Sequence, residues 1–234
     1  MYKMLSQIKS DLRKLQNPQK TKILSRFFKT GKGEYGEGDI FLGITIPNQR
    51  EISEKYQDLA LKDLQKLLSS KIHEYRLTAL IILVNKYKKA DSSLKERIVK
   101  FYLKNTKHIN NWDLVDLSSH YILGNHLLNK EKTIIYKLAK SKNIWEKRIA
   151  ILTTFAFIRN NKFEETLKIS EILLNDKHDL IQKAVGWMLR EVGKKDEKAE
   201  LKFLDKNYKK MPRTMLRYSI ERLEEKKRKF YLEN

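Results

Sequence analysis

The 234-residue sequence has no cysteine, only three prolines and eight glycines, and no long hydrophobic run. The absence of cysteine excludes disulfides, thiolate nucleophiles, iron–sulfur clusters and cysteine-bound zinc. With so little proline and glycine, few residues can form the tight turns that many short β-strands require. The most apolar stretch, Leu77–Val84, is far too short to cross a bilayer, and the N-terminal residues contain no apolar segment typical of a signal peptide. We therefore expect a helical, cytoplasmic protein that does not span or bind a membrane.

Apolar residues recur at the three- and four-residue spacing of amphipathic helices along almost the whole chain, as in Leu5, Ile8 and Leu12. Short polar connections such as Asn110-Asn111 separate these segments. Connections this short favour antiparallel neighbours, so we predict an all-α superhelix, or solenoid, of degenerate helical pairs that forms a single domain over residues 1–234. A compact helical bundle is the alternative.

One N-terminal segment departs from this helical pattern. Five of the eight glycines lie between Gly31 and Gly43, and the apolar residues Ile40-Phe41-Leu42 precede the last of them. We predict an ordered glycine-rich loop over residues 30–46. Its apolar end should pack on the first helices, so that helices and loop together form an N-terminal part, residues 1–60, packed on the solenoid.

The same loop contains a literal G-x-G-x-x-G pattern at Gly31, Gly33 and Gly36, which in another context indicates a dinucleotide site. Here no predicted strand precedes the pattern and no helix opens at its last glycine. Glu34 and Glu37 would also repel phosphate. We therefore interpret the pattern as part of a surface loop.

The chain is strongly basic, with 50 Lys and Arg against 29 Asp and Glu and a formal net charge of +21. These charges are distributed along the whole chain, so they are not confined to a basic tail. A basic body attracts polyanions, and nucleic acid is the favoured partner. An anionic membrane would require an exposed amphipathic helix, for which the Lys226–Lys229 cluster is only a weak candidate.

A predicted helix over about residues 179–192 places an aromatic residue among cations. Lys183, Trp187 and Arg190 follow one another at spacings of four and three, and therefore share one helix face. An indole can pack against a sugar or a base while the cations bind phosphates. The alternative is that Trp187 is an ordinary core residue with cations at its boundary.

A second predicted helix carries two aspartates near its start. Asp113 lies in the first turn, where a carboxylate complements the helix dipole, so its replacement should have a mild effect. Asp116 lies beyond that turn and shares a face with Trp112. A partly desolvated carboxylate attracts a nearby cation, and Arg148, in a strongly apolar segment, could be a structural partner. Alternatively, Asp116 is a surface residue paired with a lysine.

No other recognised motif appears in the chain. The five histidines have no metal-ligand spacing, and the sequence contains neither a G-x-S-x-G nucleophile motif nor a G-K-[ST] phosphate loop. We therefore expect no metal and no cofactor.

A set of short motifs occurs in order along nearly the whole chain. They are Phe27-Phe28-Lys29-Thr30, then Gly38-Asp39-Ile40-Phe41-Leu42-Gly43-Ile44 with Pro47, then Asn111-Trp112-Asp113-Leu114-Val115-Asp116, Trp145-x-x-Arg148, Gln182-Lys183-Ala184-Val185-Gly186-Trp187-x-Leu189-Arg190-Glu191 and Met211-Pro212-Arg213. Each motif is weak, but the ordered set is specific. On these residues the chain resembles the AlkD-like DNA alkylation-repair glycosylases.

The resemblance implies a monomeric superhelix of HEAT-like repeats that binds duplex DNA containing alkylated bases on a basic concave surface. It implies hydrolysis of the N-glycosidic bond of positively charged N3- and N7-alkylpurines, such as 3-methyladenine and 7-methylguanine. By position, Asp116 would be the catalytic carboxylate, Trp112 and Trp187 would lie at the lesion nucleotide, and Arg148 would contact the DNA backbone. Phe27 departs from the tyrosine of some members. The alternative function is a non-catalytic HEAT-like scaffold that binds DNA or protein.

Overall fold

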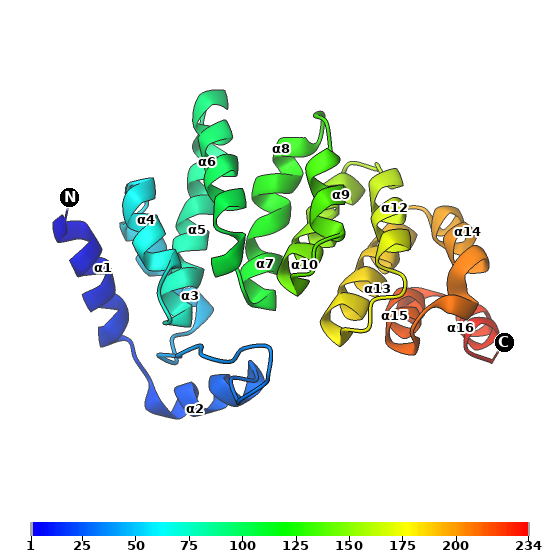
Figure 1. The fold of residues 1–234 in the computed structure, drawn as a ribbon, viewed down its shortest axis with the longest axis horizontal. Coiled ribbons are helices and arrows are strands. Elements are labelled where there is room, and N and C mark those ends of the chain that lie inside the picture. Colours follow the sequence, from blue (N-terminus) through cyan, green and yellow to red (C-terminus); the bar gives the residue numbers. More distant parts are fainter. Residues whose placement is uncertain (1, 234) are drawn as a thin grey trace. The chain divides into compact units, whose positions relative to one another are not determined.

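The computed structural model describes residues 2–233, which are helical almost throughout (Figure 1). The prediction of an all-α fold is confirmed, and the only β pairing among the described residues is an isolated bridge between Ile40 and Ile72. The chain divides into two compact units, Met1–Ser118 (unit 1) and Ser119–Asn234 (unit 2). The single domain over residues 1–234 therefore stays a prediction. No helix within the described part of the chain has the length and apolar character needed to span a membrane.

Unit 1 is built around one buried helix. Its helices are α1 (Tyr2–Lys14), α2 (Pro18–Phe27), α3 (Ile46–Lys55), α4 (Leu61–Leu68), α5 (His73–Lys89), α6 (Ser92–Lys104) and α7 (Trp112–Ser119), whose last residue enters unit 2. The apolar stretch Leu77–Val84 forms the buried centre of α5. This helix packs against α3, α4 and α6, so the most hydrophobic segment of the sequence is covered on several sides.

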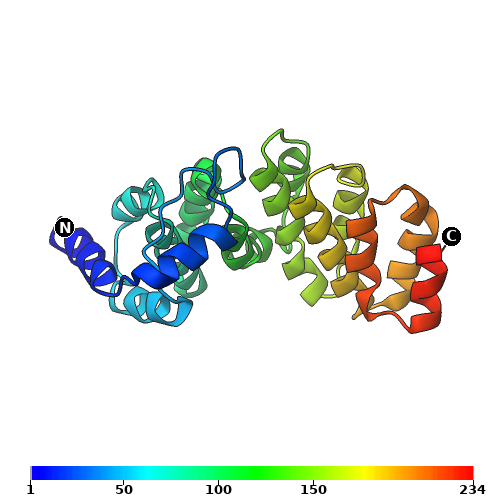
Figure 2. The ribbon, with the colours of Figure 1, turned by 90° about the horizontal axis from the view of Figure 1, so that it is seen from below.

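Helix α2 and the glycine-rich loop lie across one side of unit 1, as Figure 2 shows from below. The Asn17 side chain caps α2 by accepting a hydrogen bond from the Lys20 N–H, at 3.0 Å. The Asn17 N–H in turn donates to the Leu42 carbonyl, at 2.8 Å. Gly43 adopts a φ of 81° and lies so close to the Asn17 carbonyl that a Cβ atom would clash there. Glycine at this position therefore lets the loop approach the start of α2.

The loop satisfies its own amides. The carboxylate of Glu34 accepts from the Gly31 N–H at 2.8 Å, and that of Glu37 accepts from the Gly33 N–H at 2.9 Å. These amides are thus occupied by carboxylates, which argues against a phosphate site. Phe41 is buried, Leu42 is half-buried and Ile40 is 52% exposed. The expectation that Ile40-Phe41-Leu42 packs inward is therefore right for Phe41 and wrong for Ile40.

Unit 2 is a series of helices joined by short connections. After a π-helical turn, His120–Gly124, come α8 (Asn125–Leu127), α9 (Thr133–Ala139), α10 (Ile144–Thr153), α11 (Phe155–Arg159), α12 (Glu164–Ile172), α13 (Asp179–Gly193), α14 (Glu197–Asn207), α15 (Arg213–Ser219) and α16 (Glu225–Glu233). The central helices are α10, which packs on α9, α12 and α13, and α13, which packs on α12, α14 and α15. The side chains of Asn143, His178 and Asp196 cap α10, α13 and α14. These side chains bind backbone N–H groups that would otherwise lack partners at the starts of the three helices.

Candidate functional site

The site in unit 1 begins at the first residue of α7. Trp112 and Asp116 are four residues apart on this helix, so they share one face, and both are half-buried. The Trp112 indole stacks on the Phe28 ring, with centroids 5.2 Å apart and planes inclined by 18°. The Phe27 ring meets the indole edge-on, at 5.9 Å. The end of α2 therefore holds the tryptophan from two directions.

Asp116 affects the interior of unit 1. Tyr102 of α6 is fully buried, and its hydroxyl lies 3.0 Å from the Ser118 hydroxyl. Burial raises the pKa of Tyr102, and the negative charge of Asp116 raises it further, although the Ser118 hydrogen bond acts in the opposite direction. The carboxylate of Asp116 thus stands close enough to a buried phenol to act on it electrostatically.

A buried charged cluster lies between the glycine-rich loop, the start of α5 and the first turn of α7, and the sequence did not predict it. His73, at the start of α5, is 2% exposed and contacts a carboxylate through each ring nitrogen. Its Nδ1 is 3.1 Å from Asp39 of the loop, and its Nε2 is 2.8 Å from Asp113 of α7. Arg76 pairs with the same Asp39 oxygen, at 2.6 Å. We call these four residues the His73 cluster.

The cluster holds His73 in its charged form. Burial alone would lower the pKa of His73, but the Asp113 and Asp39 carboxylates outweigh burial and the repulsion of Arg76, and raise this pKa to about 9. With His73 protonated, two cations face two carboxylates. Both ring nitrogens then donate, which is the arrangement that the two acceptors require.

The cluster also revises the interpretation of Asp113. It lies in the first turn of α7, as predicted, but its side chain also binds a buried histidine 40 residues earlier in the chain. No local pattern around His73 indicates this pairing. The available signal was the presence of Asp39 and Asp113 in two of the ordered motifs, together with a histidine at the start of the most apolar helix.

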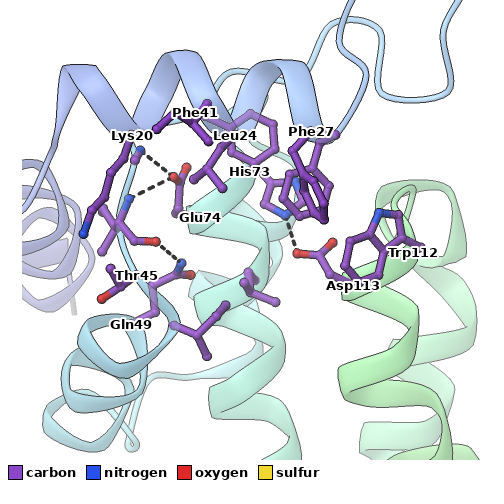
Figure 3. Close-up of a pocket in the computed structure, with 16 residues that line it drawn as sticks. Lys20, Leu24, Phe27, Phe41, Thr45, Gln49, His73, Glu74, Trp112 and Asp113 are labelled. Atoms are coloured by element: carbon purple, nitrogen blue, oxygen red, sulfur yellow. Dashed lines mark hydrogen bonds and ion pairs between the residues drawn. The ribbon is translucent and has the colours of Figure 1, made fainter.

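An apolar cavity of about 460 Å³ lies beside Trp112 (Figure 3). Its lining comes from α2, the end of the loop, α3, the start of α5 and the start of α7, and includes Phe27, Phe41 and Trp112. The carboxylate of Glu74 also lines the cavity. It is occupied by the backbone N–H groups of residues 42, 43 and 44, which donate to it at 2.7–3.2 Å. The Glu74 carboxylate is thus occupied by backbone groups, and the space beside it is largely apolar.

In unit 2, Arg148 connects α10 to α13. It is 6% exposed, and its Nη1 donates to the Leu180 carbonyl at 2.6 Å. This contact is with a backbone carbonyl, whereas the structural role considered from the sequence was an ion pair with a carboxylate. The predicted pairing of Arg148 with Asp116 stays a prediction.

Trp187 occupies the middle of α13 and is half-buried rather than a fully buried core residue. Its Nε1 donates to a Glu191 oxygen at 3.1 Å, and its ring lies 5.8 Å from that of Phe155. At the preceding residue, Gly186, a Cβ atom would clash with the Met215 carbonyl of α15. Glycine therefore allows α15 to pack closely against the helix that carries Trp187.

The cations on α13 have carboxylate partners within unit 2. Lys183 pairs with Asp179 at 2.8 Å, and its side chain is 39% exposed. Arg190 pairs with Glu221, from the turn after α15. Binding of a DNA phosphate by these cations would therefore exchange one anionic partner for another.

The structure brings together the predicted site residues in two groups. Trp112 and Asp116 share a face of α7 in unit 1. Three residues of the second group lie on α13 of unit 2 and the fourth on the adjoining α10: Lys183, Trp187, Arg190 and Arg148.

Comparison with known proteins adds a family relationship. A family model described as DNA alkylation repair enzyme matches residues 8–223. Among solved structures, the chain is similar to a predicted DNA alkylation repair enzyme from Enterococcus faecalis, with a TM-score of 0.70 and 16% sequence identity over 90% of this chain and 97% of that chain. At this identity the likeness shows a shared fold. No curated protein matches the sequence.

Proposed function

Because the chain belongs to the DNA alkylation repair enzyme family, we propose that it is a DNA glycosylase. Its reaction is hydrolysis of the N-glycosidic bond of positively charged N3- and N7-alkylpurines in duplex DNA, and Asp116 is the catalytic carboxylate. The observation that carries the proposal is the half-buried pair of Trp112 and Asp116 on one face of α7. A net charge of +21 supports a polyanionic substrate.

The charge of the lesion determines what the protein must supply. Alkylation at N3 or N7 makes the purine cationic, so the base departs as a neutral molecule and needs no proton from an acid. The barrier then lies in the positive charge that develops on the sugar. A fixed carboxylate in a poorly hydrated site stabilises that oxocarbenium ion and orients the attacking water, whose proton it accepts as the new C–O bond forms. Asp116 can perform both tasks, and neither task requires a second titratable group.

The remaining residues bind and orient the DNA. Trp112, held by two rings of α2, and Trp187 offer aromatic surface to the lesion nucleotide. Lys183 and Arg190 bind phosphates by exchanging their carboxylate partners, and Arg148 contacts the backbone at the lesion. Contacts of this kind hold the DNA in place, and such positioning is itself a large part of catalysis.

The test is the release of 7-methylguanine from methylated duplex DNA by the purified protein, measured under single-turnover conditions. Asp116→Asn should remove most of the base release and leave DNA affinity equal or slightly higher, because the change deletes a charge that repels phosphate. Asp58→Asn is the matched control, since Asp58 is exposed in the same unit and undergoes the same charge change. Near-normal excision by Asp116→Asn would refute the assignment of Asp116.

The alternative, a non-catalytic scaffold, predicts a different outcome. The wild-type protein would then bind duplex DNA in a salt-dependent manner and release no base. In that case neither Asp116→Asn nor Asp58→Asn would change the amount of base released, which would be zero in all three proteins.

A further inference from the structure

The His73 cluster is connected to the proposed catalytic helix by two separate routes. We propose that His73 is a positioning residue of the glycosylase. Its contacts hold Trp112 and the first turn of α7, and thereby determine the position of Asp116 on the same helix. This inference rests on the proposed function, because it assigns to His73 a role in that reaction. It also gives a role to the glycine-rich loop, which supplies two of the connecting side chains.

The first route is the ion pair with α7. His73 Nε2 lies 2.8 Å from the Asp113 carboxylate, and Asp113 directly follows Trp112 in the first turn of the helix (Figure 3). The other oxygen of Asp113 accepts from the Leu114 N–H at 2.8 Å, so this carboxylate is held at both ends. A rigid link of this kind fixes the start of α7 relative to α5.

The second route is a stack of aromatic rings. The His73 ring lies on Phe41 (4.5 Å between centroids, 22° between planes) and Phe41 lies on Phe28 (5.0 Å, 18°). Phe28 in turn lies on Trp112 (5.2 Å, 18°). The Phe28 ring also meets the His73 ring directly, with centroids 5.1 Å apart and planes tilted by 36°. His73, Phe41 and Phe28 therefore form one cluster of rings, which contacts the Trp112 indole through Phe28. A change in the His73 ring would therefore reach Trp112 through Phe28, both directly and by way of Phe41.

The loop completes the arrangement. Asp39 of the loop contacts Nδ1 of His73, the ring nitrogen that Asp113 does not contact. The same Asp39 carboxylate accepts a hydrogen bond from the side chain of Asn111, the residue immediately before α7, at 3.3 Å. The backbone of His73 is held as well, because its N–H donates to the Ile40 carbonyl at 2.8 Å. One loop therefore supplies the counter-charge Asp39, the stacking ring Phe41 and this backbone contact.

The position of the start of α7 should depend on whether His73 is protonated, because the charges of the cluster balance only in that state. The charged groups that face His73 are Asp39 from the loop, Arg76 from α5 and Asp113 from α7. From α2 it meets the apolar Phe28 ring, and the neighbouring Glu74 is occupied by loop amides. Loss of the proton leaves one carboxylate without a counter-charge in a buried place, which is costly. The start of α7 should then shift to expose Asp113.

The first experiment observes this link without any substrate. The protein is prepared with 5-fluorotryptophan, and the ¹⁹F resonance of Trp112 is assigned with Trp112→Phe. As the pH rises from about 7 to about 10, this resonance should shift with a midpoint near 9, the pKa of His73. The shift should be absent in His73→Gln, and in Asp39→Asn it should occur at lower pH because one stabilising carboxylate is missing. A Trp112 resonance that does not respond to pH in the wild type would overturn the inference.

The second experiment measures the reaction. His73→Gln should lower the single-turnover rate of 7-methylguanine release at about pH 7 by about 10- to 100-fold, because small misplacements of reacting groups are costly. DNA affinity should remain unchanged. His126→Gln, a histidine substitution in unit 2, is the control and should behave as the wild type. Circular dichroism establishes that each variant is folded.

Asp39→Asn keeps His73 in place and provides an independent readout. Its rate relative to the wild type should fall between about pH 7 and 9, and the ratio at each pH cancels any titration of the lesion itself. An unchanged rate in His73→Gln, or a ratio that does not vary with pH, would refute the positioning role. If the wild type released no base, the proposed function would fail, and the fluorine titration would still decide whether His73 sets Trp112.

Discussion

Replacing Asp113 by asparagine should destabilise the protein by about 3 kcal/mol, far more than its position in a helix suggests. A first-turn carboxylate contributes about 0.3–1 kcal/mol through the helix dipole. The removal of one partner from a buried ion pair costs about 3–5 kcal/mol. The side chains of His73 and Asp113 are 2% and 15% exposed, so the larger range applies.

The pKa of His73 gives a similar magnitude for the cluster as a whole, in which Asp113 is the larger of the two carboxylate contributions. A rise from 6.5 to about 9 corresponds to roughly 3 kcal/mol at about 1.4 kcal/mol for each pH unit. Because the folded-state pKa lies above the unfolded value, this stabilisation is fully present below pH 6.5 and is lost as the pH rises through about 9. The difference between the wild type and Asp113→Asn should therefore shrink on the alkaline side.

Urea unfolding followed by circular dichroism measures both effects. The control is Glu164→Gln, which removes a carboxylate from the first turn of α12, where the side chain is 73% exposed and pairs with Lys168. That variant should be close to the wild type in stability, because an exposed ion pair of this kind contributes little. If Asp113→Asn were equally mild at every pH, the His73 cluster would not stabilise the fold as argued. The expected loss also makes Asp113→Asn unsuitable as a folding-neutral control for Asp116→Asn.

Three further outcomes are expected. Duplex DNA binding should weaken with salt, and Lys183→Gln should reduce the slope of log affinity against log salt by about 0.9 in anisotropy titrations; an unchanged slope would remove Lys183 from the DNA face. Duplexes that contain uracil should stay intact under conditions that release 7-methylguanine, because a single carboxylate offers no acid to protonate a departing anion. Uracil release that Asp116→Asn abolishes would contradict this mechanism. Burial, and secondarily the charge of Glu197, raises the pKa of Glu200 to about 8 from 4.5, so the wild type should lose stability as the pH rises through this range. Glu200→Gln should lack that loss. Urea unfolding between about pH 5 and 6.5, below the range in which His73 titrates, measures the difference. There the free energy of unfolding of the wild type should fall by close to 1.4 kcal/mol for each pH unit, and that of the variant should lack this fall.

Several features of this protein depend only on residues close together in the sequence. The helical class follows from apolar spacing, and the caps at Asn17 and Asn143 act within three residues of their own position. The shared faces of Trp112 with Asp116, and of Lys183 with Trp187, follow from the helical repeat. All these relations extend over one helical turn, so the sequence was sufficient to predict them.

Only the tertiary structure decided which distant groups meet. Nothing local indicates that His73 lies between Asp39 and Asp113, which are 34 and 40 residues away. Nor does helix periodicity predict that Arg190 pairs with Glu221 or that Ile40 remains exposed. An ion pair between elements forms only where packing brings two charges within a few ångströms and removes water from both. The sequence therefore determined which residues share a helix face, and packing determined which distant charged groups and aromatic rings contact one another.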